Sequence, residues 1–174
     1  MNEVEIKNKA IEMKRQHGQI DVVKLANALG IVVYGADLDD DVNSWIEYEK
    51  EENQFCIVVN KNHSPQRQYF SISHEIGHFV LHNDQIKEKG KVGRQDEHSL
   101  TAKEEQEADE LGAEILMPKE LIREYAKDDL KIQDNTPVTQ KIIKQIARYF
   151  DVSKEASIMR MRNLGYYVPY ISFG

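Results

Sequence analysis

The chain has 174 residues, 40% of them hydrophobic, which is enough for one domain with a real core and excludes a disordered chain. The formal net charge of −7 argues against nucleic-acid binding by the protein as a whole, because phosphate contacts need positive potential. No apolar run reaches the roughly 18 residues of a membrane span, and the charged N-terminus lacks the apolar core of a signal peptide. The single cysteine, Cys56, excludes an internal disulfide, so we expect a cytoplasmic protein with no membrane partner.

The first sixty residues predict two helices followed by a small sheet. Helical patterns cover residues 4–15 and 21–30. Strand patterns cover residues 31–34, 44–48 and 54–60, the last two forming a hairpin. Asp21 and Gly30 are typical of an N-cap and a C-terminal stop. Cys56 falls in the last strand, where we expect a buried and inert thiol.

The rest of the chain is mainly helical. Helical patterns cover residues 69–82, 102–117, 119–127, 138–150 and 154–163. Residues 83–101 are polar, contain Gly90 and Gly93 and show no apolar periodicity, so we expect a long connection whose length suits a gate over a cleft. An aromatic tail follows at residues 166–173.

A metal-binding motif lies within the third predicted helix, at residues 74–78 (HEIGH), the H-E-x-x-H arrangement of zinc-dependent peptidases. On a helix, His74 and His78 lie one turn apart on the same side, so both rings reach one tetrahedral cation. Glu75 lies about 100° further round, where it suits a general base better than a ligand. The helix is apolar over most of its circumference, which favours metal binding over histidines that face solvent or bond backbone carbonyls. His82 is too far along the helix for the same ion, so we expect it to support the site or the fold.

A third protein ligand is expected from a separate helix, because catalytic zinc sites use three protein ligands and leave one position for water. The acidic stretch at residues 104–110 offers candidates. Relative to the apolar face of that helix, Glu107 lies at the edge and Glu104 nearer the centre, whereas Asp109 points well away. Periodicity does not separate Glu107 from Glu104, and any one of these carboxylates also fits a solvated helix surface. Gly77 inside the metal helix fits a close approach of another backbone, or neutral drift.

Three segments together resemble the core of the ImmA/IrrE family of metallo-endopeptidases: residues 57–60, 67–82 and 107–118. The last segment, EADELGAEILMP, follows the family pattern Glu-Ala-Asn-x-Phe-Ala-x-x-Leu-Leu-Met-Pro. It departs from that pattern at Asp109, which replaces Asn, and at Leu111-Gly112, which replace Phe-Ala. These changes are expected to loosen the helix packing and to leave the ligand in place. The resemblance extends over about residues 20–165 and implies Glu107 as the third ligand.

Together, the elements and the resemblance predict an α+β fold with a small antiparallel sheet packed on a zincin-like helical core. We expect this core in residues 1–130 and a C-terminal helical lobe, similar to a helix-turn-helix, in residues 131–174. The site is expected to hold Zn²⁺ through His74, His78 and Glu107, with Glu75 as the general base of peptide hydrolysis. The resemblance implies a narrow protein substrate, a helix-turn-helix repressor of a mobile element or a stress operon.

Other functional classes stay open. Residues 138–162 are rich in Lys and Arg and contain two short helices, so the chain is alternatively a regulatory protein that binds DNA or a repressor, with a structural metal site. A helical lobe packed on the core, with its lysines in solvent, explains the same pattern, and direct nucleic-acid binding is not expected. A metal-bound scaffold without activity is a third class, against which the intact Glu75 argues. His98, Tyr125 and Tyr166 are candidate donors to the oxyanion, and the sequence does not choose among them.

Overall fold

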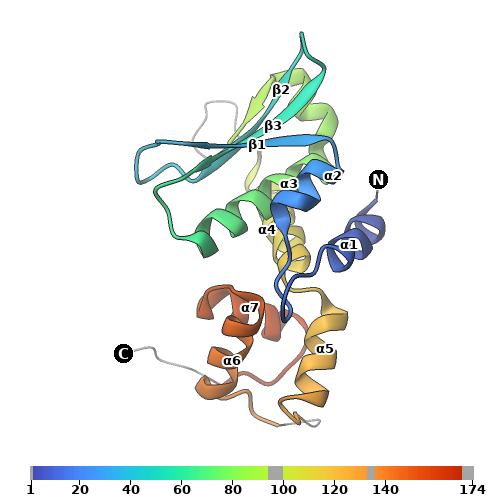
Figure 1. Cartoon of the computed structure of the whole chain (residues 1–174), viewed down its shortest axis with the longest axis vertical. Coiled ribbons are helices and arrows are strands. Elements are labelled where there is room, and N and C mark those ends of the chain that lie inside the picture. The colour runs from blue at the N-terminus through green and yellow to red at the C-terminus, as the bar shows by residue number, and fades with distance from the viewer. Residues whose placement is uncertain (1, 94–99, 133–135, 170–174) are drawn as a thin grey trace.

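A computed structural model describes residues 2–93, 100–132 and 136–169 and has an α+β fold, in agreement with the prediction (Figure 1). Its elements within these ranges are α1 (Glu3–Glu12), α2 (Val22–Ala28), β1 (Ile31–Ala36), β2 (Ser44–Glu49), β3 (Gln54–Asn60), α3 (Pro65–Lys89), β4 (Lys91–Val92), α4 (Ala102–Leu116), α5 (Lys119–Asp128), α6 (Gln140–Phe150) and α7 (Lys154–Asn163). No helix in the described ranges combines the length and the apolar character needed to cross a membrane.

The sheet is mixed, with the strand order β1-β3-β2-β4, so the prediction of an antiparallel sheet is wrong in one respect. Strands β2 and β3 form the predicted antiparallel hairpin, whereas β1 pairs with β3 in parallel, with Ile31 opposite Phe55. The central strand β3 is buried from Phe55 to Asn60, and Cys56 is buried as expected. A continuously apolar strand is typical of a central position, but a strand pattern does not reveal its neighbours or their direction.

Helix α3 is longer than predicted and occupies part of the expected connection. It begins after Ser64, whose Oγ accepts a hydrogen bond of 3.4 Å from Arg67 N, and it ends at Gly90, whose φ is 82°. Its backbone departs from helical angles at His82 (φ −128°, ψ 25°) and then continues, because Ile86 is fully buried against the core. The short strand β4 follows and pairs with β2. Residues 94–99 of the expected connection lie outside the described residues.

The site depends on a very close contact between α3 and α4. A Cβ atom on Gly77 would lie 2.8 Å from Ala108 O, and one on Gly112 would lie 3.0 Å from His74 N. Gly77 thus permits the close backbone approach that its position suggested. The expectation that Gly112 loosens this helix is wrong, because α4 packs tightly on the backbone of His74 at this point.

Helices α5, α6 and α7 gather at the end of the molecule opposite the sheet, with α4 leading down to them (Figure 1). A left-handed Asp151 (φ 55°) ends α6, and Ser153 caps α7 by accepting a hydrogen bond of 3.0 Å from Ala156 N. Arg160 of α7 is buried and donates to Glu114 Oε1 and to Met117 O, both at 3.0 Å. These bonds hold α7 against the end of α4.

Candidate metal centre

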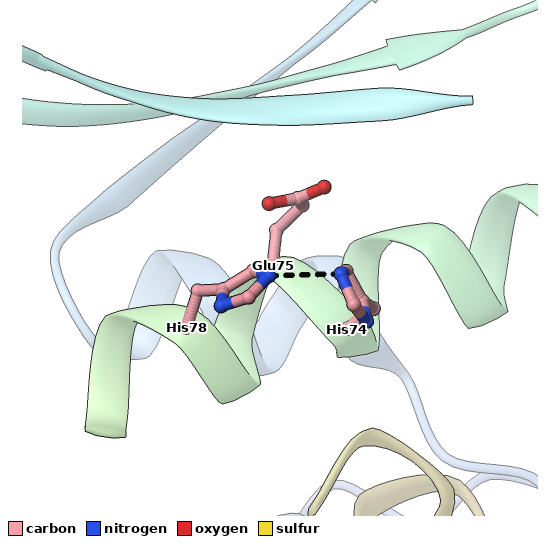
Figure 2. A group of neighbouring side chains, drawn as sticks. All are labelled: His74, Glu75 and His78. Atoms are coloured by element: carbon pink, nitrogen blue, oxygen red, sulfur yellow. Dashed lines mark hydrogen bonds between the residues drawn. The ribbon is translucent and has the colours of Figure 1, made fainter. Parts of the chain in front are cut away.

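The two motif histidines lie side by side in the buried middle of α3 (Figure 2). The Nε2 atoms of His74 and His78 are 2.9 Å apart, and the two rings are nearly perpendicular, with an interplanar angle of 87°. Two imidazole nitrogens that converge from successive turns of one helix are arranged as ligands of a single cation.

Glu105 of α4 completes this arrangement from the facing helix. Its Oε2 lies 3.4 Å from His74 Nε2, and its Oε1 lies 3.4 Å from His78 Nε2. Burial acts to raise the pKa of Glu105, but the hydrogen bonds and charges of His74 and His78 outweigh it and hold the pKa well below its usual range. The carboxylate therefore faces both imidazoles in its charged form, as a metal ligand does.

The structure does not bring Glu107, which the resemblance implied as the third ligand, to the imidazole pair. Its Oε1 pairs with Lys103 Nζ at 3.4 Å, its side chain is 42% exposed, and it lines a separate hollow. The alternative, Glu104, caps its own helix through Thr101 and accepts a hydrogen bond of 2.7 Å from Gln85 Nε2. These bonds lower the pKa of Glu104 to about 2 without any contribution from the motif.

The helical geometry of α4 explains this difference. Residues at positions i, i+3, i+4 and i+7 share a helix face, and here they are Glu105, Ala108, Asp109 and Gly112. The backbones of Ala108 and Gly112 both approach α3 closely. Periodicity located the apolar face correctly, but it does not reveal which edge of that face turns toward the histidines. That edge is indicated in the sequence by two small residues, Ala108 and Gly112, that share one helix stripe with the carboxylates of Glu105 and Asp109.

Asp109 supports His74 from this stripe, so the prediction that it points well away is wrong. Asp109 Oδ1 lies 2.9 Å from His74 Nδ1, where the ring N–H donates to the carboxylate. A proton held at Nδ1 leaves the lone pair of His74 Nε2 directed toward His78 and Glu105. A carboxylate behind a ligating histidine is a common feature of metal sites, because it fixes the tautomer and the ring orientation.

Glu75 projects from α3 toward the sheet, and one of its carboxylate oxygens lies within 4.8 Å of a ring nitrogen of His74 and of His78 (Figure 2). It is buried, and its Oε1 accepts a hydrogen bond of 2.6 Å from Ser44 Oγ of β2. Its Oε2 is also buried and has no hydrogen-bond partner. Burial raises the pKa of Glu75, while His74, His78 and Ser44 oppose that shift. A buried carboxylate with one oxygen anchored and the other available suits a proton acceptor.

The site opens into a cleft of about 540 Å³ between α3 and the 37–43 loop, a volume typical of ligand-binding pockets. The residues that line the cleft are Asp37, Leu38, Asp39, Asp41, Val42, Asn43, Ser44, Trp45, Arg67, Phe70, Ser71, His74, Glu75, Lys91 and Gly93. His82 does not line it; this residue is buried next to the helix kink, with Nε2 3.3 Å from Glu104 O. His82 therefore fits the expected structural role.

The donor set fits a divalent metal ion. Donor atoms of His74, Glu75 and His78 lie within 4.8 Å of one another. Glu75 is anchored by Ser44, whereas the carboxylate of Glu105 faces both Nε2 atoms, so Glu105 is the better third ligand. Two imidazoles and one carboxylate form a ligand set typical of catalytic zinc sites.

The candidate oxyanion donors do not converge on this site. Tyr125 stacks on Tyr149, with ring centroids 3.8 Å apart, and neither Tyr125 nor Tyr166 lines the cleft. His98 lies outside the described residues. The described part of the chain therefore identifies no side-chain donor for the oxyanion among the three candidates.

The fold and the site together define a metallopeptidase, and comparison with known proteins gives its family. Residues 26–162 match the family Peptidase_M78, described as the IrrE N-terminal-like domain, so the chain belongs to the ImmA/IrrE family of metallopeptidases. The chain is 26% identical over 165 residues to "Metallopeptidase ImmA" of Bacillus subtilis (strain 168), an alignment that covers 92% of this chain and 86% of that protein.

A solved structure, "Mycobacterium tuberculosis transcriptional regulator", shares the fold with a TM-score of 0.60 and 17% sequence identity. The superposition covers 91% of this chain and 46% of that one, so the chain spans just under half of the regulator's length.

Proposed function

We propose that this chain is a zinc-dependent endopeptidase whose metal ligands are His74, His78 and Glu105. The observation that carries the proposal is the convergence of both Nε2 atoms and the Glu105 carboxylate, each nitrogen being 3.4 Å from a carboxylate oxygen. The neighbouring Glu75, with one buried oxygen available, supports a catalytic centre over a purely structural metal site.

Each residue has a distinct role in this proposal. A zinc ion in the site would polarise the scissile carbonyl and make water acidic enough to lose a proton near neutral pH. Glu75 accepts the proton of the attacking water and returns it to the leaving amine. Ser44 holds the other Glu75 oxygen in place, and Asp109 keeps the proton of His74 on Nδ1.

The proposed substrate is a protein, specifically a helix-turn-helix transcriptional repressor of a mobile element or a stress operon. This part of the proposal rests on the resemblance to the ImmA/IrrE family. The open cleft beside the site supports a protein substrate, because it leaves room for a peptide segment next to Glu75.

Metal analysis and a cleavage assay test the proposal. Purified protein is expected to carry close to one zinc per chain and to cleave the repressor encoded next to its own gene. The matched control is Glu75→Gln, which keeps the size of the side chain, is expected to retain zinc, and should lose the cleavage product. Cleavage by Glu75→Gln at the wild-type rate contradicts the mechanism.

The second candidate is a regulatory protein that binds DNA or a repressor through its C-terminal helices. It is supported by the three-residue turn between α6 and α7 and by five exposed cations. These are Lys141, Lys144, Arg148, Lys154 and Arg162. Arg160 counts against this candidate, because it is buried against Glu114 and does not reach a ligand. A gel shift with the neighbouring promoter, with and without chelator, separates binding from cleavage.

A further inference from the structure

The catalytic cleft has a neighbour on the side of the C-terminal helices. A second hollow of about 280 Å³ lies between the start of α3, the end of α4 and the start of α7. The residues that line it are Ser64, Gln66, Arg67, Phe70, Leu116, Val152, Ser153 and Ala156. Phe70, Leu116, Val152 and Ala156 contribute the apolar surface. A dry cavity of roughly 150 Å³ binds benzene, so this hollow has room for a large apolar side chain.

The hollow and the catalytic cleft are adjacent along one face of α3. Arg67 and Phe70 line both of them, and they lie on the same helix stripe as His74 because their positions are i, i+3 and i+7. The side chain of Arg67 is fixed at the boundary, since its Nε donates to Asn43 Oδ1 at 2.7 Å. A peptide that enters the cleft at His74 and Glu75 therefore reaches the hollow by running along this stripe.

Hydrogen bonds between residues far apart in the sequence hold α7 in place as one wall of the hollow. Asp151, which ends α6 two residues before the α7 cap Ser153, accepts hydrogen bonds from Gln66 Nε2 at 2.8 Å and from Gln19 Nε2 at 2.7 Å. Arg160 ties the other end of α7 to Met117 O. The hollow is thus a pre-formed feature of the fold, and pre-formed subsites bind without a large ordering cost.

We infer that the C-terminal lobe supplies an apolar subsite of the peptidase, which takes a bulky apolar side chain of the substrate at a fixed distance from the scissile bond. This inference rests on the proposed function and adds a substrate class to it. The occupant is an extended peptide segment, because the hollow continues from the cleft that holds Glu75. The lobe then acts in substrate selection in addition to packing on the core.

Ala156→Trp tests the inference, since an indole at this position fills the hollow. Met159→Trp is the matched control, because Met159 lies on the same helix but is 58% exposed and lines neither hollow. Ala156→Leu, which fills the hollow partly, serves if the larger residue impairs folding. Each zinc-loaded full-length protein is incubated with the repressor encoded next to its gene and with repressor variants in which each residue flanking the cleavage site is replaced in turn by Ala, Leu, Met or Phe. Cleavage of each variant is measured by mass spectrometry.

The wild-type protein is expected to prefer Leu, Met or Phe over Ala at one position relative to the scissile bond, by roughly 10-fold or more, as apolar pockets discriminate. In Ala156→Trp the preference at that position should fall toward equality or shift to small residues, mainly through KM, with zinc content and thermal midpoint retained. Met159→Trp should keep the wild-type preference. An unchanged preference in Ala156→Trp, or no apolar preference in the wild type, overturns the subsite inference. Neither result contradicts the proposed peptidase function. A zinc-loaded wild type that cleaves nothing overturns the proposed function itself.

Discussion

Helix α4 contributes to a polar cluster near each of its ends, and the two clusters differ in whether their polar atoms have hydrogen-bond partners. Near its start, Glu105 and Asp109 meet the motif of α3, where the buried atoms Glu75 Oε2 and His78 Nδ1 have no hydrogen-bond partner. Near its end, Glu114 is bonded to Arg160 and Lys7, and Arg160 also donates to Met117 O. The first cluster leaves polar atoms available, whereas the second pairs them.

This difference suggests different roles for the two clusters. The first belongs to the candidate metal centre, and the second, formed by Glu114, Arg160 and Lys7, is a structural joint that holds α1 and α7 on α4. A buried polar atom without a partner costs roughly 1–3 kcal/mol, so two of them in one place point to a group that binds there. A buried ion pair with full hydrogen bonding instead fixes how two elements pack. Changes near the start of α4 are therefore expected to affect metal and catalysis, and changes near its end to affect stability.

The largest expected effect is the loss of metal from Glu105→Ala. Removing a ligand leaves only two imidazoles, so zinc affinity should fall on the order of 1000-fold, beyond the 10- to 100-fold effect of outer-shell changes. Competition with a chromophoric chelator measures the affinity. Glu107→Ala is the matched control, two residues along the same helix, and should bind zinc as the wild type does. The opposite pattern, with the metal lost only in Glu107→Ala, would restore Glu107 as the ligand.

The joint gives the next largest effect. Arg160→Ala should lower the free energy of unfolding by about 2 kcal/mol, because it removes the hydrogen bonds of a buried guanidinium to Glu114 and to Met117 O. Urea unfolding of the zinc-loaded protein measures this change. Arg162→Ala, in an exposed position on the same helix, should stay within about 0.5 kcal/mol of the wild type. A drop in zinc affinity in Arg160→Ala would show that the two ends of α4 are not independent.

Most of the elements could be predicted from the sequence, because their boundaries are local. Asp21 and Gly30 mark helix ends, one by a side-chain cap and the other by a positive φ, and the structure places them in those roles. The parallel pairing of β1 with β3 is a tertiary choice that no strand pattern contains. The extension of α3 beyond His82 rests on the burial of one residue, Ile86, which gives no periodicity of its own.

The site was predictable on α3 and not on α4. The spacing of His74, Glu75 and His78 is a property of a single helix, so the sequence alone predicts that they lie together, and their donor atoms are within 4.8 Å of one another. Which carboxylate of α4 faces the imidazole pair depends on the rotation of α4 about its own axis relative to α3. That rotation is set by the backbone contacts at Ala108 and Gly112, which side-chain hydrophobicity does not register.

A smaller effect is expected from the support behind His74. Asp109→Ala should weaken zinc binding by roughly 10- to 100-fold, because His74 loses the acceptor that fixes its Nδ1 proton. Asp109→Asn keeps a carbonyl acceptor and should lie between Asp109→Ala and the wild type. Glu110→Ala is the control, since Glu110 is exposed on the same helix and accepts a hydrogen bond from Gln106. Equal affinities of Asp109→Ala and Glu110→Ala would contradict a supporting role.

The smallest expected effect is the acid sensitivity of the joint. Burial acts to raise the pKa of Glu114, but Lys7 and Arg160 outweigh it and lower the pKa below the ordinary value of 4.5. A carboxylate with a lowered pKa in the folded state stabilises the protein above its unfolded pKa, and this contribution disappears as the pH falls through the folded pKa. In the metal-free protein, Glu114→Gln should therefore be less stable than the wild type near neutral pH by about 0.5 kcal/mol, the size of a partly exposed ion pair. The two unfolding curves should converge as the pH falls below about 4, because the protonated carboxyl of Glu114 and the amide that replaces it in the variant are then both neutral.

A stability difference that stays constant from neutral to acid pH would contradict this prediction. It would mean that the joint depends on packing and on neutral hydrogen bonds rather than on the charge of Glu114.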